Sequence, residues 1–135
     1  MMKKLLGVLG CAVFFVGASL QAQTSKSAPV GVWRSFDNGL PTVTLTLAED
    51  SGEIGGTVVF YAIDRESRRV LSVEPHTLLQ AKLEGHMLTF QMRLGGDRPG
   101  LARVDVAFGA ENKTMLHCLD CGADSPTVEL IRQTE

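Results

Sequence analysis

The sequence contains few cysteines and few aromatic residues, and it has no basic run. Among its 135 residues there are 3 cysteines, 1 Trp and 1 Tyr. A closed zinc site needs four ligands, so the cysteines alone cannot complete one. The chain carries 13 Lys+Arg against 15 Asp+Glu, a formal net charge of −2. Such a mildly acidic chain gives no electrostatic reason to expect nucleic acid or anionic lipid as a partner.

The motifs that usually mark an enzyme are also absent. There is no Gly-x-Ser-x-Gly elbow, no His-Glu-x-x-His and no phosphate-cradling glycine loop. The histidines, His76, His86 and His117, fall at predicted strand ends or loops and have no identifiable carboxylate partner. We therefore expect a protein that is not an enzyme and that holds no cofactor and no metal ion.

The N-terminus has the pattern of a secretory signal. A basic start, Met1–Lys4, precedes an apolar stretch over Leu5–Val16, and Ala18 and Ala22 follow as small residues at candidate cleavage sites. The apolar stretch is 12 residues long, which is too short for a stable membrane anchor, the alternative interpretation. The pattern therefore predicts export to the periplasm or the extracellular space.

Signal cleavage would divide the chain into three parts. The sequence predicts a cleavable signal peptide over residues 1–22, a flexible leader over 23–29 and a single folded domain over 30–135. Cleavage removes two lysines, so 13 basic residues become 11 against 15 acidic ones, and the formal charge changes from −2 to −4. No integral membrane segment is expected in the remaining chain.

The folded part shows hydrophobic alternation with a period of two. Thr42–Leu47, Leu88–Leu94 and Val104–Phe108 each alternate aliphatic or aromatic residues with polar or small ones. Such alternation is typical of antiparallel strands with one face on a core and the other in water. Thr57–Ile63 is apolar on both faces, which indicates a central strand or one covered on its outer side.

Turn-forming residues separate these runs. Residues 49–53 and 95–100 are rich in glycine and acidic residues, and Glu84-Gly85 suits a tight hairpin because glycine accepts a positive φ. The charged run over residues 64–69 is interpreted as a solvated loop. These turns and runs predict about eight short strands.

One segment is compatible with two structures. Residues 77–84 contain strong helix formers and a Thr-x-x-Gln start, so a two-turn helix is one interpretation. A strand is favoured because the turn at Glu84-Gly85 leads directly into the clear strand that follows. The predicted fold is all-β, an antiparallel up-and-down meander forming a small barrel, with a two-sheet sandwich as the alternative.

The two ends of the domain carry a recognisable pattern. Gly31-Val32-Trp33 opens the first predicted strand, Gly55-Gly56-Thr57 enters the second strand of the first hairpin, and Arg132 lies on the last strand. This pattern resembles the calycins, the group of small barrels that includes lipocalins and avidins. The layout also looks like that of small exported bacterial proteins that begin with Gly-x-Trp. The polar residues with which avidins hold biotin are not found, so biotin binding is not expected.

The resemblance implies a contact between the ends of the chain. In calycins an Arg from the last strand lies over the Trp of the first strand and closes the barrel without touching the ligand. We therefore expect the strands over residues 30–36 and 127–133 to be neighbours and Trp33 and Arg132 to meet as a barrel-closing pair. Ordinary core packing with a cation over an aromatic face is the alternative for both residues.

Cys118 and Cys121 form a Cys-x-x-Cys pair with three interpretations. A redox pair favours a helix start at the first Cys, but Gly122 and Pro126 follow. A metal site needs further ligands from distant parts of the chain. A disulfide in a hairpin loop suits an exported protein and is favoured, with an inert thiol pair as its reduced form.

We carry three hypotheses for the function. The first is a non-catalytic binding domain that holds a small apolar or amphipathic ligand in the barrel mouth. The second is a structural or protein-interaction domain of the cell envelope that uses Thr57–Ile63 as a contact surface. The third is an enzyme. The candidate ligand-lining residues are Phe60, Phe90, Met92, Val104, Val106 and Phe108.

Overall fold

The structure, a computed structural model, describes residues 29–95, 97, 99–110 and 112–134. The predicted signal peptide and most of the predicted leader lie outside the described residues. Where the structure describes the chain there is no helix, and so none long and apolar enough to cross a membrane. The strands are β1 (Gly31–Asp37), β2 (Leu40–Asp50), β3 (Glu53–Asp64), β4 (Arg69–Thr77), β5 (Leu79–Glu84), β6 (Met87–Arg93), β7 (Leu101–Phe108), β8 (Lys113–Cys118) and β9 (Thr127–Arg132).

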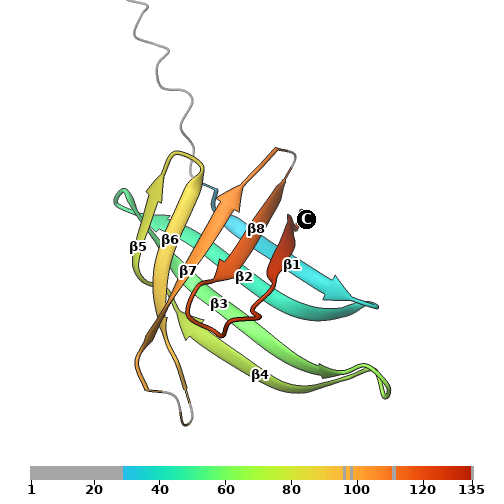
Figure 1. Ribbon diagram of the computed structural model, residues 1–135. Helices are drawn as coiled ribbons and strands as arrows, with labels where there is room; N and C mark the ends of the chain where they lie inside the picture. The colour runs from blue at the N-terminus through green and yellow to red at the C-terminus, as the bar shows by residue number, and fades with distance from the viewer. Residues whose placement is uncertain (1–28, 96, 98, 111, 135) are drawn as a thin grey trace, which may run out of the picture.

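The nine strands form one antiparallel sheet in the order β4-β3-β2-β1-β9-β8-β7-β6-β5. Chain neighbours pair throughout, with the exception of β4 and β5, and the first strand pairs with the last. The sheet curls into a nearly closed barrel (Figure 1). The predicted all-β, up-and-down barrel is therefore confirmed over the two-sheet sandwich. The barrel has one unsealed seam, which lies between β4 and β5.

The seam arises where the chain bends at Leu78. This single residue joins β4, which pairs with β3, to β5, which pairs with β6. The Leu78 side chain is buried, and its amide donates to the carbonyl of Gly56, 3.0 Å away. The strand predicted over residues 77–84 is confirmed by β5, and the alternative helix does not form. Gln80 has a φ of 53° inside the bulge that separates Leu79 from Lys82.

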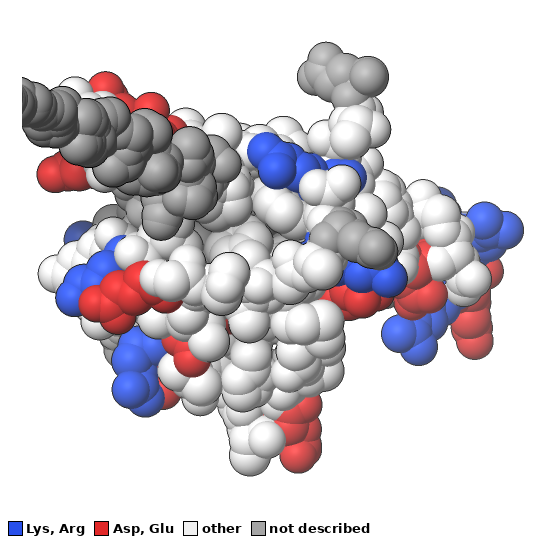
Figure 2. Space-filling view, turned by 90° about the horizontal axis from the view of Figure 1, so that it is seen from above, with Lys and Arg blue, Asp and Glu red and all other residues white. Residues whose placement is uncertain are grey.

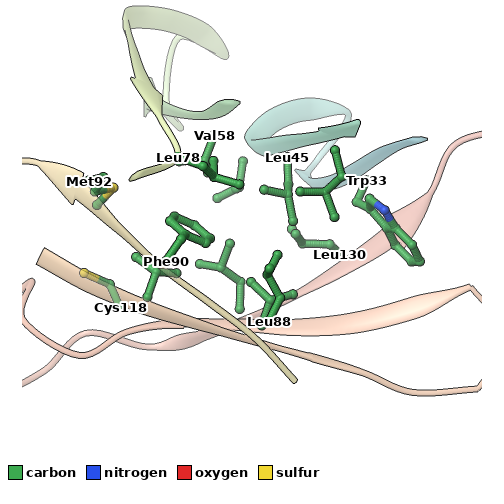
Figure 3. Packing of buried hydrophobic residues seen from close by; sticks show 14 of the residues in the cluster. Trp33, Leu45, Val58, Leu78, Leu88, Phe90, Met92, Cys118 and Leu130 are labelled. Carbon is green, nitrogen blue, oxygen red and sulfur yellow. The ribbon is translucent and has the colours of Figure 1, made fainter. Parts of the chain in front are cut away.

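The core is formed by the inner face of the barrel. Because side chains alternate between the two faces of a strand, every second residue belongs to the core. Along β6, buried Leu88, Phe90 and Met92 alternate with Thr89 and Gln91, which face outward. Figure 3 shows the buried cluster, with Trp33 at one side and Met92 and Cys118 at the other. The fully enclosed members include Leu45, Val58, Leu88, Val104, Val106, Leu116 and Leu130.

A glycine allows β2 and β3 to approach closely. Gly56 has a φ of +145°, and a Cβ placed on it would overlap the backbone carbonyl of Thr46. Only glycine fits this conformation and this space without a shift of the backbone. Gly56, the second glycine of the Gly55-Gly56 pair in β3, therefore has a structural reason in the hairpin itself.

Strand length differs around the barrel. β2 and β3 have 11 and 12 residues, whereas β8 and β9 have 6 each. The long strands consequently project past the short ones, and the β3–β4 hairpin extends beyond the rest of the sheet (Figure 1). The candidate site lies at this end of the barrel, between the β3–β4 pair and the end of β6 with the segment that connects β8 to β9.

Candidate functional site

Trp33 and Arg132 lie together at one end of the barrel. They are direct partners in the register of β1 and β9. The guanidinium carbon of Arg132 lies 5.3 Å from the centroid of the Trp33 ring, within the range of a cation–π contact. Arg132 also donates a hydrogen bond to the backbone carbonyl of Val30. The first and last strands therefore bring the two residues into contact.

The Trp33 end of the barrel is filled. The Trp33 ring packs edge-to-face on Phe108 with 5.2 Å between ring centroids, and its indole N–H donates to the carbonyl of Pro29. Arg132 covers Gly31, where an added Cβ would lie 3.3 Å from the guanidinium Nε. These contacts satisfy the indole N–H of Trp33 and leave Trp33 3% exposed. We call this the closed end.

A cavity of about 750 Å³ occupies the opposite end, which we call the open end. This volume lies within the range of small-molecule sites, roughly 300–1,000 Å³. Four parts of the chain contribute its walls. These are the inner faces of β2, β3, β8 and β9, the edge strand β4, the end of β6, and the segment that connects β8 to β9. The lining residues are Val43, Phe60, Val73, Glu74, Pro75, His76, Met92, Leu94, Gly95, Leu116, Cys118, Cys121, Ser125, Pro126 and Val128.

The predicted lining residues divide between this cavity and the packed core. Phe60 and Met92 line the cavity. Phe90, Val104 and Val106 are at most 2% exposed and fill the middle of the barrel instead, while Phe108 packs on Trp33 at the closed end. The four residues share the inner face with Phe60 and Met92, but they do not line the cavity.

Several residues that line the cavity were not predicted from the sequence. Val43, Leu116 and Val128 lie on inner faces and line the cavity, where Leu116 pairs with Val128 and Val43 pairs with Phe60. Their alternation with outward residues is visible in the sequence. Their height depends on the pairing register, which the sequence pattern alone does not provide.

Two polar side chains stand at the cavity on the inner face of β4. Glu74 pairs with Phe60, and His76 pairs with the buried Val58. Paired residues in an antiparallel ladder project to the same face, so both polar side chains point to the barrel interior. The His76 ring lies edge-to-face on Phe60 with 5.8 Å between ring centroids.

Cys118 and Cys121 lie at disulfide distance, with their Cα atoms 5.5 Å apart. Cys118 ends β8 and is buried, and both residues line the cavity. The loop that they begin therefore forms part of the cavity wall. Within the described residues, no group of three His, Cys, Asp or Glu side chains is placed to hold a metal ion.

An ion pair fixes the same loop to β7. The guanidinium of Arg103 donates two hydrogen bonds to the carboxylate of Asp120, at 3.0 and 3.2 Å, and its backbone amide donates a third at 3.0 Å. The hydrogen bond from the Arg103 side chain lowers the pKa of Asp120 below its ordinary value. The Leu119 amide also donates to the Arg103 carbonyl. The first two residues of the loop, Leu119 and Asp120, are thus both hydrogen-bonded to Arg103 on β7.

Charges of both signs are mixed over the surface. Figure 2 shows acidic and basic side chains beside one another around the periphery, with no broad field of one sign on that face. Arg65, for example, pairs with Asp37 at 2.9 Å, in the charged run that was interpreted as a solvated loop.

Together these features define an antiparallel β-barrel that is filled at one end and hollow at the other. No protein family, curated protein or solved structure that we compared with the chain matches it. The cavity is therefore the feature of the molecule that bears most directly on its function.

Proposed function

We propose that this protein is a non-catalytic, exported barrel domain that binds a small apolar or amphipathic ligand at its open end. The observation that carries the proposal is the cavity of about 750 Å³, whose deep wall is formed by Val43, Leu116 and Val128. Burial of apolar ligand surface against such a wall is favourable by roughly 25 cal/mol per Å². The calycin-like arrangement of Trp33 and Arg132 at the other end supports the same proposal.

The proposal is tested by filling the cavity. Val128 is half-buried and lines the cavity, so Val128→Phe places additional volume inside it. Val70 is exposed on β4 and does not line the cavity, so Val70→Phe is the matched control. Binding of decanol is measured by displacement of a neutral environment-sensitive fluorophore. We expect Val128→Phe to weaken binding by about tenfold or more, equivalent to a loss of about 1.4 kcal/mol.

The control variant Val70→Phe shows whether a loss of affinity is specific to the cavity. Val70→Phe should leave the affinity within about twofold, because an exposed surface substitution changes little. Equal weakening by both variants, or no binding of decanol by the unchanged protein, would remove the cavity as the ligand site. Mass spectrometry of protein purified natively from its own envelope fraction then identifies any retained small molecule.

A second candidate function is an interaction domain of the cell envelope. The observation in its favour is the free edge of β4, where Leu71 is 61% and Val73 54% exposed. An unpaired edge of this kind can accept an extended segment of another protein as an additional strand. The surface expected from the sequence, Thr57–Ile63, lies in β3 between β2 and β4, so its own edges are both paired.

Pro75 disfavours strand addition at the free edge of β4, so the interaction domain is the second candidate function. Because the Leu78 amide points to β3, alternation along the ladder directs the backbone of Pro75 away from β3 and toward the free edge. Proline offers no N–H there, and proline on an edge strand discourages strand addition. A photo-crosslinking residue at position 71 tests the candidate against the same residue at Met115, which is exposed on β8. A single adduct at position 71 alone supports it, and equal labelling at both positions contradicts it.

A further inference from the structure

The charge around the open cavity selects among amphipathic ligands. Glu74 is the one lining residue with a carboxylate, and no Lys or Arg lines the cavity among the residues that the structure describes. The remaining wall is apolar except for the His76 ring, the Ser125 hydroxyl and backbone groups.

The position of Glu74 places its charge at the rim. Glu74 is exposed, whereas its cross-strand partner Phe60 is half-buried and packs against the core. An occupant whose apolar part contacts Phe60, Val43 and Leu116 therefore has its polar end beside β4. The polar end of the ligand and the Glu74 carboxylate then share the same side of the cavity.

We propose that the cavity takes a single-chain amphiphile with a protonated amine as its polar end, in preference to a fatty acid. An ammonium group donates hydrogen bonds to a carboxylate and attracts it electrostatically, while a second carboxylate beside Glu74 is repelled. This inference rests on the proposed function, because it assigns a chemical class to the same cavity.

The size of the preference follows from the exposure of Glu74. Ion pairs at solvent-exposed sites are weak, so we expect decylamine to bind about two- to fivefold more tightly than decanol. Decanoate should bind more weakly than decanol by a similar factor, because like charges repel at the same distance. The three compounds have the same alkyl chain, so the comparison isolates the polar end.

The experiment measures all three ligands by fluorophore displacement on the full domain at about pH 8, where alkylamines, like the Lys side chain, stay protonated. The variant is Glu74→Gln, which removes the charge and keeps the shape. The matched control is Glu66→Gln, an exposed residue in the turn that joins β3 to β4 and outside the cavity lining.

The order decylamine, decanol, decanoate in the unchanged protein, lost in Glu74→Gln and kept in Glu66→Gln, supports the inference. Tightest binding of decanoate, or an amine preference that survives Glu74→Gln, overturns it. Equal binding of all three ligands also overturns it and leaves the proposed function standing. Absence of binding for all three overturns the proposed function as well, so the two failures are distinguished.

Discussion

The closed and open ends of the barrel are built by the same alternating strands but are packed differently. At the closed end Trp33 is 3% exposed and contacts Phe108, Arg132 and the carbonyl of Pro29. At the open end Phe60 has a similar inward orientation, yet it is half-buried and borders a cavity. Two inward aromatic residues thus have different surroundings in one sheet.

Strand length explains the difference. The closed end is sealed where β1 and β9 pair and where Arg132 crosses over Trp33. At the open end, the hairpin of β3 and β4 projects past the shorter strands (Figure 1), and a cavity separates these two strands from the end of β6 and the segment that connects β8 to β9. Because the closed end is packed and the open end is hollow, we expect stability to depend mainly on the closed end and the proposed ligand binding mainly on the open end.

The largest expected effect tests this division directly. Trp33→Ala removes a buried aromatic side chain and should lower the free energy of unfolding by about 3–5 kcal/mol. Phe60→Ala removes a half-buried one and should cost only about 1–2 kcal/mol, while weakening ligand binding more than Trp33→Ala does. Urea denaturation and fluorophore displacement measure the two quantities. If Trp33→Ala does not fold, Trp33→Phe gives a smaller loss at the same position. Equal costs at both ends would contradict the division.

The next effect concerns the loop at the open end. Replacing Cys118 and Cys121 together by Ala should lower the free energy of unfolding by about 2 kcal/mol, because the unfolded chain regains the entropy that the short closed loop removes. The same loop lines the cavity, so ligand binding should weaken too. Thermal unfolding before and after reduction of the unchanged protein provides the control, since reduction should shift its melting temperature in the same direction. An unchanged melting temperature in both experiments would show that the cysteines are not bonded in solution.

The sequence predicted the sheet better than it predicted the cavity. Clean alternation in β2, β6 and β7 was sufficient to assign those strands. β4 has no such pattern, because nearly all of its residues are exposed and the core does not select one of its faces. β4 is the additional strand that brings the number to nine, where the sequence predicted about eight.

The height of a residue along the barrel was not predictable from alternation. Period two distinguishes the inward face from the outward face, so it groups Phe90, Val104 and Val106 with Met92. Only the packing of the folded barrel shows that the first three are enclosed in the core and that Met92 reaches the cavity. The position of the seam depends likewise on a single buried residue, Leu78, at which the chain changes its pairing partner.

A smaller effect is expected from the cation at the closed end. Arg132→Ala removes the cation–π contact with Trp33 and the hydrogen bond to Val30, and it should cost about 1 kcal/mol. The melting temperature should fall and Trp fluorescence should change, with ligand affinity within about twofold of the original. Arg34→Ala is the matched control, since Arg34 lies on the exposed face of the neighbouring strand. A loss of affinity with an unchanged melting temperature would place Arg132 in the binding site instead.

The smallest expected effect is the pH response of the loop at the open end. The side-chain hydrogen bond from Arg103 lowers the pKa of Asp120 below the ordinary value of 3.8. A carboxyl group with a lower pKa in the folded state stabilises the fold at pH values above its unfolded pKa, and this stabilisation is lost as the pH falls through the folded pKa. The loop should therefore loosen only below about pH 3.8, and because the pair is exposed the change in melting temperature should be small.

The carboxyl resonance of Asp120, followed by NMR during an acid titration, measures this response most directly. Arg103→Gln removes the charged donor, so the pKa of Asp120 should rise toward its ordinary value. Asp64 provides an internal control in the same spectra, because its pKa is lowered by the hydroxyl of Ser67 in the turn between β3 and β4, away from Arg103. Its titration should not change in Arg103→Gln. A parallel shift of both carboxyl groups would indicate a general change in the barrel, whereas a shift of Asp120 alone shows that Arg103 holds the cavity loop locally.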